Sequence, residues 1–307
     1  MTATDTAKSD RTDRPLAGIG WMLITTLLFV CVTGIVRHLG SDMPAIEAAF
    51  IRYVIGLALI APMMRPLIHR WPGARALKLY AARGVVHGIA VMLWFYAMAR
   101  IPIAEVTAIG YSAPIFVTIG AALFLGERLH TRRIAAIAIG FLGTLVILRP
   151  GFEAVSLGQL AQLTAAPLFA TSFILAKKLT EREDPTIIVG MLSLTCTLTL
   201  LPGALLQWRT PSVEEVFWLA LTAVFATAGH YTLTRAFRAA PLTVTQPIGF
   251  LQLVWAALLG MIAFGEALDP FVFAGGGLVV AAATYISHRE AVAARRVRTP
   301  PSVATKM

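Results

Sequence analysis

Ten long apolar runs, separated only by short polar connections, constrain this chain more than any other feature. The runs cover residues 16–36, 46–64, 80–98, 104–125, 134–148, 157–177, 186–206, 214–236, 242–264 and 271–287. A helix of roughly 17 to 25 apolar residues spans a bilayer, and only the fifth run falls a little short. No connection is long enough to fold as a soluble domain. The sequence therefore predicts an all-α integral membrane protein with ten transmembrane helices.

The composition supports a membrane environment. The chain of 307 residues is 57% hydrophobic and only 14% charged, whereas soluble domains carry about 25% charged residues. Its net charge of +10 would suggest nucleic acid on a soluble protein. Here the basic residues lie between apolar runs, so the lipid bilayer is the expected partner and nucleic acid is not. Cys31 and Cys196 lie inside apolar runs without metal-ligand spacing, which favours packing roles.

The distribution of Lys and Arg predicts the orientation. With the N-terminus inside, 21 of these residues lie on the cytoplasmic side and only four in the outer connections. The positive-inside rule then predicts that both termini lie in the cytoplasm. We expect a multi-pass protein of the inner (plasma) membrane. The first run is longer than the apolar part of a usual signal peptide and has no convincing cleavage site, so we expect it to be retained.

An internal repeat divides the chain into halves. Residues 120–129 read GAALFLGERL and residues 259–268 read LGMIAFGEAL, an offset of 139 that also aligns Pro102 with Pro241 and Tyr111 with Phe250. Each copy contains five helices, and because five is odd the second copy enters the membrane from the opposite side. We predict two inverted five-helix repeats, 16–149 and 150–290, with cytoplasmic tails 1–15 and 291–307. Inverted repeats are typical of secondary transporters, whose substrate site lies near the midplane between the halves.

These features resemble the ten-helix EamA type of the drug/metabolite transporter superfamily over residues 16 to 290. The matching stretches are Glu105-Val-Thr-Ala-Ile-Gly-Tyr-Ser-Ala-Pro114, Phe124-Leu-Gly-Glu-Arg128, Ile51-Arg52, Arg235-Ala-Phe-Arg-Ala-Ala-Pro241, Gln252-Leu-Val-Trp255, Phe264-Gly-Glu266 and Tyr285-Ile-Ser-His-Arg-Glu290. The resemblance implies transport without ATP and a central cavity lined by helices 1–4 and 6–9, with helices 5 and 10 peripheral. Residues 105–114 look most like transporters of riboflavin or S-adenosylmethionine, and amino-acid exporters look similar.

Arg52 is the most informative side chain. A charge inside a span costs about 2.5–3.5 kcal/mol on insertion scales and needs an inward partner or water. Its helical neighbours include Ala45, Ala48, Ala49 and Gly56, small residues that favour packing inside a bundle. Arg52 is thus a candidate ligand for an anionic substrate group; the alternative is that it snorkels outward or caps carbonyls of a neighbouring helix.

Two histidines lie on polar helix faces. His87 shares its face with Arg83 and Trp94, and His230 shares its face with two threonines. A membrane histidine can couple proton movement to transport, and the alternative is a hydrogen-bonded packing role. Arg83 lies near the start of its predicted helix, which favours an interface anchor.

Helices 4 and 9 supply the remaining candidates for the cavity. Tyr111 shares a stripe with Thr107 and Pro114, while Gln252 and Trp255 fall on one side of helix 9. An amide and an aromatic ring at mid-depth suit an organic substrate with a flat or polar part; interhelical hydrogen bonding and plain packing are the alternatives. The predicted substrate-binding residues are thus Arg52, His87, Trp94, Tyr111, His230, Gln252 and Trp255.

Four carboxylates lie at predicted helix ends. Glu47 and Glu105 begin helices 2 and 4, where the helix dipole favours a negative charge; a role as outer proton acceptor is the alternative. Glu127 and Glu266 follow glycines, which favours capping and interface solvation over substrate binding.

Other functional classes are poorly supported. The sequence contains no metalloprotease motif, no clustered metal ligands, no catalytic triad at one depth and no Walker motif, so we expect no catalytic residues, metal or cofactor. We predict a secondary transporter that moves a small organic metabolite by alternating access, coupled to protons or working by exchange. The substrate alternatives are efflux of amino acids or other metabolites and uptake of riboflavin or S-adenosylmethionine-like cofactors. A non-transporting membrane sensor or scaffold of the same fold, and a homodimer, remain open.

Overall fold

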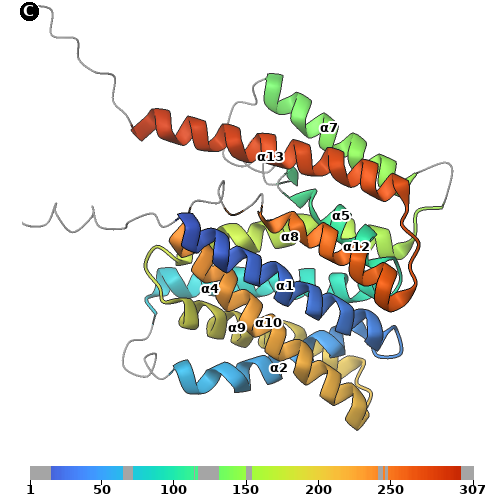
Figure 1. Ribbon diagram of the computed structural model, residues 1–307. Helices are drawn as coiled ribbons and strands as arrows, with labels where there is room; N and C mark the ends of the chain where they lie inside the picture. Colours follow the sequence, from blue (N-terminus) through green and yellow to red (C-terminus); the bar gives the residue numbers. More distant parts are fainter. Residues whose placement is uncertain are drawn as a thin grey trace, which may run out of the picture.

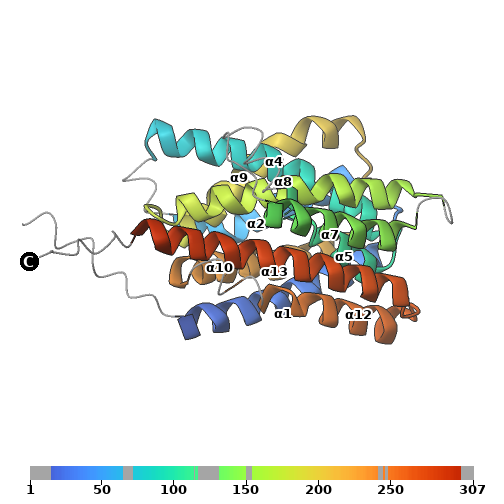
Figure 2. The same ribbon diagram turned by 90° about the horizontal axis from the view of Figure 1, so that it is seen from above.

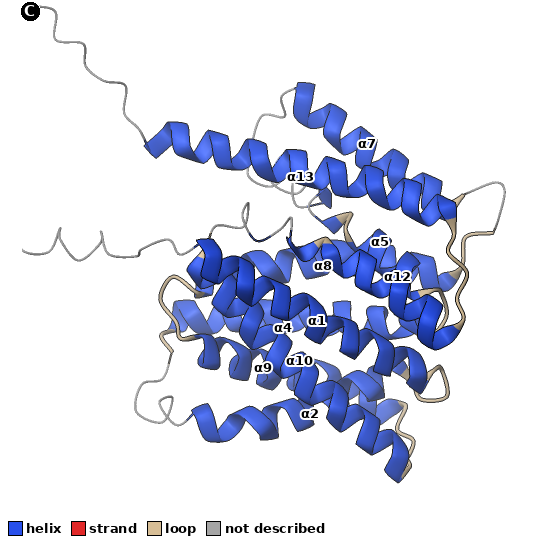
Figure 3. Ribbon diagram, in the orientation of Figure 1, coloured by secondary structure: helices blue, strands red, loops and turns tan. Residues whose placement is uncertain are grey.

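The computed structural model describes residues 15–64, 72–113, 115–116, 131–149, 154–240, 245 and 248–298. This part of the chain is all helical and contains no strand (Figure 3). Ten α-helices and one short 3-10 helix are described: α1 (Pro15–Leu39), α2 (Ala45–Ile60), η2 (Ala61–Met64), α4 (Ala74–Met98), α5 (Ile103–Gly110), α7 (Thr131–Leu148), α8 (Leu157–Leu179), α9 (Pro185–Leu206), α10 (Val213–Ala239), α12 (Leu251–Phe264) and α13 (Pro270–Arg298).

The helix ends follow local capping chemistry. Ser156 and Ser212 each form a capping box with the side chain three residues later, at the starts of α8 and α10. Such boxes satisfy amide donors that have no partner within the helix. Asp184 caps α9, with a proline at the first helical position. The C-terminal end of α12 is also defined locally. This helix stops at Gly265, whose φ of 63° is the left-handed conformation that glycine adopts readily.

Within the described part of the chain, six helices are long and apolar enough to cross a membrane: α1, α2 with η2, α4, α8, α9 and α10. Shorter apolar helices cover Ile134–Leu148, Leu251–Phe264 and Pro270–Tyr285. The predicted order of helices is confirmed, with differences at the ends. Helix α4 begins at Ala74, before the predicted residue 80, and α13 runs to Arg298, so residues 291–298 are helical although a tail was predicted there.

Several predicted features lie outside the described residues. They are the tail 1–14, Pro114, the repeat motif 120–129 with Glu127, residues 241–244 with Pro241, and the C-terminal residues 299–307. Of the predicted fourth helix, the described part is α5 together with residues 111–113 and 115–116.

The most extensive packing joins the two predicted halves of the chain. Helix α1 packs on α10, α4 on α8, α2 on α9 and α7 on α13, and α5 contacts α12. Figures 1 and 2 show α7 and α13 lying together along one side of the bundle formed by the other helices. Both helices contact α5, and α13 also approaches Leu253 of α12 at Gly276.

Two glycines bring α7 and α13 into close contact. A Cβ added to Gly275 would lie 2.5 Å from the carbonyl oxygen of Gly143, and one added to Gly143 would lie 2.6 Å from that of Gly275. The absence of side chains at both positions therefore allows the two backbones to meet. Small residues at such crossings are typical of helix packing in membranes.

Candidate functional site: a central cavity

A cavity of about 390 Å³ lies at the centre of the bundle, within the range of small-molecule sites. Side chains of α1, α2, α4, α5, α8, α10 and α12 line it, together with residues 111, 113, 249 and 250. No described side chain of α7, α9 or α13 does. Helices 5 and 10 (α7 and α13) were expected to be peripheral, and their absence from the described lining agrees with that expectation. Helix 7 (α9) was expected to line the cavity, but it packs on α2 and α4 instead.

Much of the cavity wall is aromatic. Phe169 and Phe173, one turn apart on α8, have ring centroids 6.2 Å apart and planes at 14°. Across the cavity, Tyr111 meets Phe250 edge to face at 4.9 Å, and its hydroxyl donates a hydrogen bond of 2.8 Å to the Gly249 carbonyl. Tyr111 and Phe250 are the residues that the 139-residue offset aligns, so equivalent positions of the two halves pack against each other.

Arg52 lies within this wall and is almost completely buried, with 5% of its surface exposed. Its guanidinium carbon is 4.0 Å from the centroid of the neighbouring Tyr53 ring. The Arg52 Nη1 atom and the Tyr53 hydroxyl are both buried without a hydrogen-bond partner. Arg52 therefore neither snorkels to an interface nor caps a carbonyl through Nη1, and the bundle surrounds its charge.

The two predicted histidines meet in the cavity although they come from different halves of the chain. The ring centroids of His87 and His230 are 5.0 Å apart. His87 Nδ1 lies 2.8 Å from the Ser172 hydroxyl, whereas His87 Nε2 and His230 Nδ1 are buried without partners. Both residues line the cavity, and each ring thus carries one buried nitrogen without a partner.

Six of the seven predicted substrate-binding residues line the same cavity, namely Arg52, His87, Trp94, Tyr111, His230 and Gln252. Trp255 does not: it lies almost one turn further along α12 than Gln252, and its indole nitrogen is buried without a partner. A polar residue that the sequence analysis did not select, Gln162 on α8, also lines the cavity and is 2% exposed. An amide within an apolar run is the signal that would have identified it, although Gln159 in the same run shares that signal.

Arg83 differs from the interface anchor that its position in the predicted helix suggested. Because α4 begins at Ala74, Arg83 lies more than two turns inside the helix and is 1% exposed. Its Nη1 donates to the Ile188 carbonyl at 3.4 Å, and its Nε has no partner. Arg83 is thus a second buried positive charge, one turn from His87.

Polar contacts close the bundle beyond one end of the cavity. Arg37, at the end of α1, donates to the carbonyls of Met98 and Ile101 at 3.1 and 3.3 Å and forms a 2.9 Å ion pair with Glu266. Glu266 also accepts the Ile103 backbone N–H at 2.9 Å, at the start of α5. Glu266 therefore joins three helices, which is more than the local capping that its sequence suggested.

At the opposite end of the bundle, Lys177 at the end of α8 donates to the carbonyls of Phe237 and Ala240. The acceptors correspond to Met98 and Ile101 at the offset of 139. In each half, therefore, a cation ending the first helix binds the carbonyls that end the third helix.

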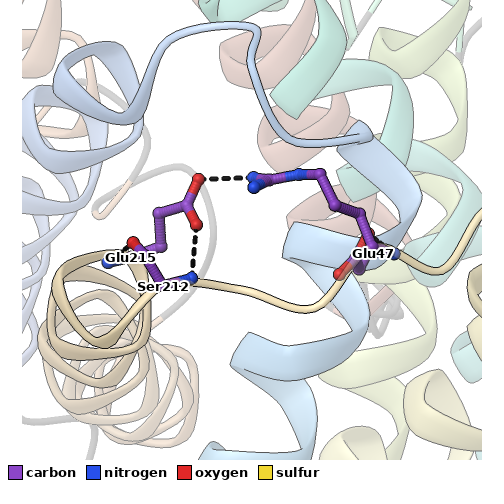
Figure 4. Close-up of polar contacts among 4 residues, drawn as sticks. Glu47, Ser212 and Glu215 are labelled. Atoms are coloured by element: carbon purple, nitrogen blue, oxygen red, sulfur yellow. Dashed lines mark hydrogen bonds and ion pairs between the residues drawn. The ribbon is translucent and has the colours of Figure 1, made fainter.

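The connection between α9 and α10 is tied to α2 by a further polar cluster. Arg209 pairs with Glu215, Glu215 accepts the Ser212 N–H at 2.7 Å, and the Arg209 N–H donates to Glu47 at 3.1 Å (Figure 4). Hydrogen bonding to Glu215 raises the pKa of Arg209 above its usual value. Glu47 is completely buried, so it holds this connection in place as well as beginning its helix.

Among the described residues, no group of three or more His, Cys, Asp or Glu side chains is placed to hold a metal ion.

The helices and the cavity together define a class of protein: a multi-pass helical membrane protein whose two halves enclose an aromatic cavity with a few buried polar groups. A family model for the EamA-like transporter family matches the chain twice, over residues 16–149 and 156–288. The chain belongs to this family.

Curated relatives of similar length are transporters, not enzymes. A riboflavin transporter of Vibrio cholerae is 28% identical over 289 residues, covering 92% of this chain and 97% of the relative. An S-adenosylmethionine uptake transporter of Rickettsia felis is 27% identical, with coverage of 92% and 96%. A pseudopaline exporter of Pseudomonas aeruginosa is also 27% identical, with coverage of 88% and 96%. One solved crystal structure shares the fold, with a TM-score of 0.55, 19% identity, and coverage of 92% of this chain and 98% of that one.

Proposed function

We propose that this protein is a secondary active transporter that moves a small organic metabolite across the bacterial inner membrane without ATP. The observation that carries the proposal is the central cavity, which side chains from both halves line. Arg52, His87 and His230 are among them, and each has a buried polar atom without a partner. A buried polar group without a partner costs free energy unless a ligand or water satisfies it. A solute that enters the cavity supplies those partners.

The inverted repeat, 16–149 followed by 150–290, is part of this proposal. The two matches to the family model support it, as do the equivalent bonds that Arg37 and Lys177 make at opposite ends of the bundle. The excess of Lys and Arg in alternate connections supports both termini in the cytoplasm. In this orientation the Arg37–Glu266 pair closes the periplasmic end and Lys177 lies at the cytoplasmic end.

Alternating access follows from this arrangement as the transport mechanism. The halves rock about the cavity and expose it to each side in turn. The Arg37–Glu266 pair and the hydrogen bond from the Ile103 N–H to Glu266 join the halves, so they break when the periplasmic end opens. The bonds of Lys177 lie within the second half and move with it. Movement of protons through His87 and His230, or exchange of one solute for another, supplies the coupling.

The candidate substrate classes are amino acids, riboflavin-like cofactors and S-adenosylmethionine-like cofactors. The names of the relatives support the two cofactor classes. The test is a thermal-unfolding screen of the purified protein against these metabolites. A ligand at about a hundredfold its dissociation constant adds about 2.7 kcal/mol of stability. We expect one class to raise the melting temperature of the wild type, and Arg52→Ala and Gln252→Ala to abolish that shift. The matched control is Gln207→Ala, which removes an exposed amide at the end of α9 and should retain the shift in melting temperature. A shift that survives in both cavity variants would place the site elsewhere.

A further inference from the structure

We infer that one wall of the cavity binds an anionic group of the substrate, a carboxylate or a phosphate, and that Arg52, His87 and His230 form this site. The inference rests on the proposed transport function and names its substrate class. It begins with charge: Arg52 and Arg83 are both buried at 5% and 1% exposure, and neither forms an ion pair with a carboxylate of the described residues.

The acidic residue nearest to Arg52 on its own helix does not neutralise it. Glu47 lies five residues earlier on α2, which places it about 140° around the helix from Arg52. Glu47 instead accepts the Arg209 N–H. A buried charge without a counter-charge is strongly destabilising, so the site that surrounds Arg52 is complete only when a negative group enters.

The histidines complete the geometry for such a group. His87 Nδ1 lies 2.8 Å from the Ser172 hydroxyl, which leaves Nε2 as the ring nitrogen without a partner. His230 Nδ1, on a ring 5.0 Å from that of His87, is the second unpaired nitrogen. Together with Arg52 Nη1 these are three unpaired polar atoms on cavity-lining residues of α2, α4 and α10, and hydrogen bonds to charged oxygens are the strongest kind.

The aromatic wall defines the rest of the ligand. Phe29 contacts His230 edge to face at 5.2 Å, and Phe169 contacts His87 in the same way at 5.3 Å. An apolar or flat body therefore lies directly beside the anionic group. Amino acids and S-adenosylmethionine carry a carboxylate and satisfy this requirement, whereas riboflavin is neutral and does not.

The test compares ligand pairs that share a body and differ in charge. Binding to the protein, purified in a non-ionic detergent, is measured for indole-3-acetate against indole-3-acetamide and for riboflavin 5′-phosphate against riboflavin. We expect the anion of at least one pair to bind at least about tenfold more tightly than its neutral partner, a difference of about 1.4 kcal/mol. The carboxylate and phosphate arms show which anion the site takes.

Three substitutions assign the preference to Arg52. Arg52→Gln should reduce it below about threefold, and Arg52→Lys, which keeps the charge, should retain most of it. The matched control is Arg235→Gln, because Arg235 lies outside the cavity, over the Trp21 ring at 5.0 Å; its preference should equal that of the wild type.

Equal affinity for the anion and the neutral compound in both pairs overturns the inference. A preference for the anion that survives in Arg52→Gln also overturns it, as does failure of both anions to bind at millimolar concentration. The outcome is separable from that of the proposed function. A protein that accumulates a solute in vesicles without any preference for anions retains the transport function and loses the anion site. A protein that prefers anions but moves no solute retains the site and loses the transport function.

Discussion

Removing the carboxylate of Glu266 should open the end of the cavity that we propose faces the periplasm. Glu266 pairs with Arg37 and accepts the Ile103 N–H, so it holds α12 against α1 and α5. The ion pair is partly exposed, with side-chain exposures of 23% and 11% for Arg37 and Glu266, so we discount it to about 1 kcal/mol. The hydrogen bond from the Ile103 N–H to a carboxylate contributes about 1.5 kcal/mol.

Two substitutions separate these contributions. Glu266→Gln keeps an acceptor for the Ile103 N–H and loses the ion pair, which should favour the open state about fivefold, since about 1 kcal/mol is lost. Glu266→Ala loses both contacts, and the combined loss of about 2.5 kcal/mol should favour the open state about seventyfold. These values apply because both contacts must break when this end opens.

The assay is modification of a cysteine introduced at Thr33, which lines the cavity one turn from Arg37, by a membrane-impermeant maleimide in intact cells. Cys31→Ser removes the exposed native cysteine. The labelling rate should rise in the order wild type, Glu266→Gln, Glu266→Ala. Asp269→Ala is the control, because it breaks the Arg149–Asp269 pair in the same connection without touching Arg37. Equal labelling rates in all four proteins would refute a closing role for Glu266.

Two further predictions concern stability, measured by thermal unfolding in detergent. Gly275→Val should destabilise the protein by about 1–3 kcal/mol through its clash with Gly143, whereas Gly277→Val, at a position with no atom within 4 Å of its Cβ, should not; equal losses would mean that the close contact is unimportant. Ser212→Ala should cost about 1 kcal/mol by removing the cap of α10, and an unchanged melting temperature would contradict the role of the capping box.

The number and order of the helices could be predicted from the sequence because the length of an apolar run reports directly on the bilayer. The ends were less predictable. Helix α4 begins six residues before the predicted start because Ala74, Arg75 and Lys78 are compatible with helix although they are not uniformly apolar. That difference explains the error at Arg83, since a residue placed near a helix start was expected to reach the interface.

The cavity residues were predictable where polarity was unusual for a span. Arg52, His87 and His230 stand out because burying such groups is costly, and all three line the cavity. Phe169 and Phe173 do not stand out, because an aromatic residue in an apolar run is equally suited to lipid or to a cavity. Trp255 was selected because it is aromatic and shares a helix face with Gln252. Neither property indicates the depth at which the cavity ends.

Contacts between distant segments were beyond the sequence. The 139-residue offset aligns Lys177 closely with Arg37, but nothing in it indicates that each donates to carbonyls at the end of a third helix. Likewise, the pair between Arg37 and Glu266 joins residues from opposite ends of the chain. Such contacts depend on how the halves pack together.

The most direct test of the central claim is movement of solute by the purified protein. Proteoliposomes loaded with one unlabelled metabolite class at a time are diluted into the same metabolite carrying an isotope label. The account predicts label accumulation for one class, dependent on the protein and strongly reduced in Arg52→Gln, which removes a charge that lines the cavity. If a metabolite binds the protein tightly and no label enters the vesicles, the account of a transporter is contradicted and the sensor alternative takes its place.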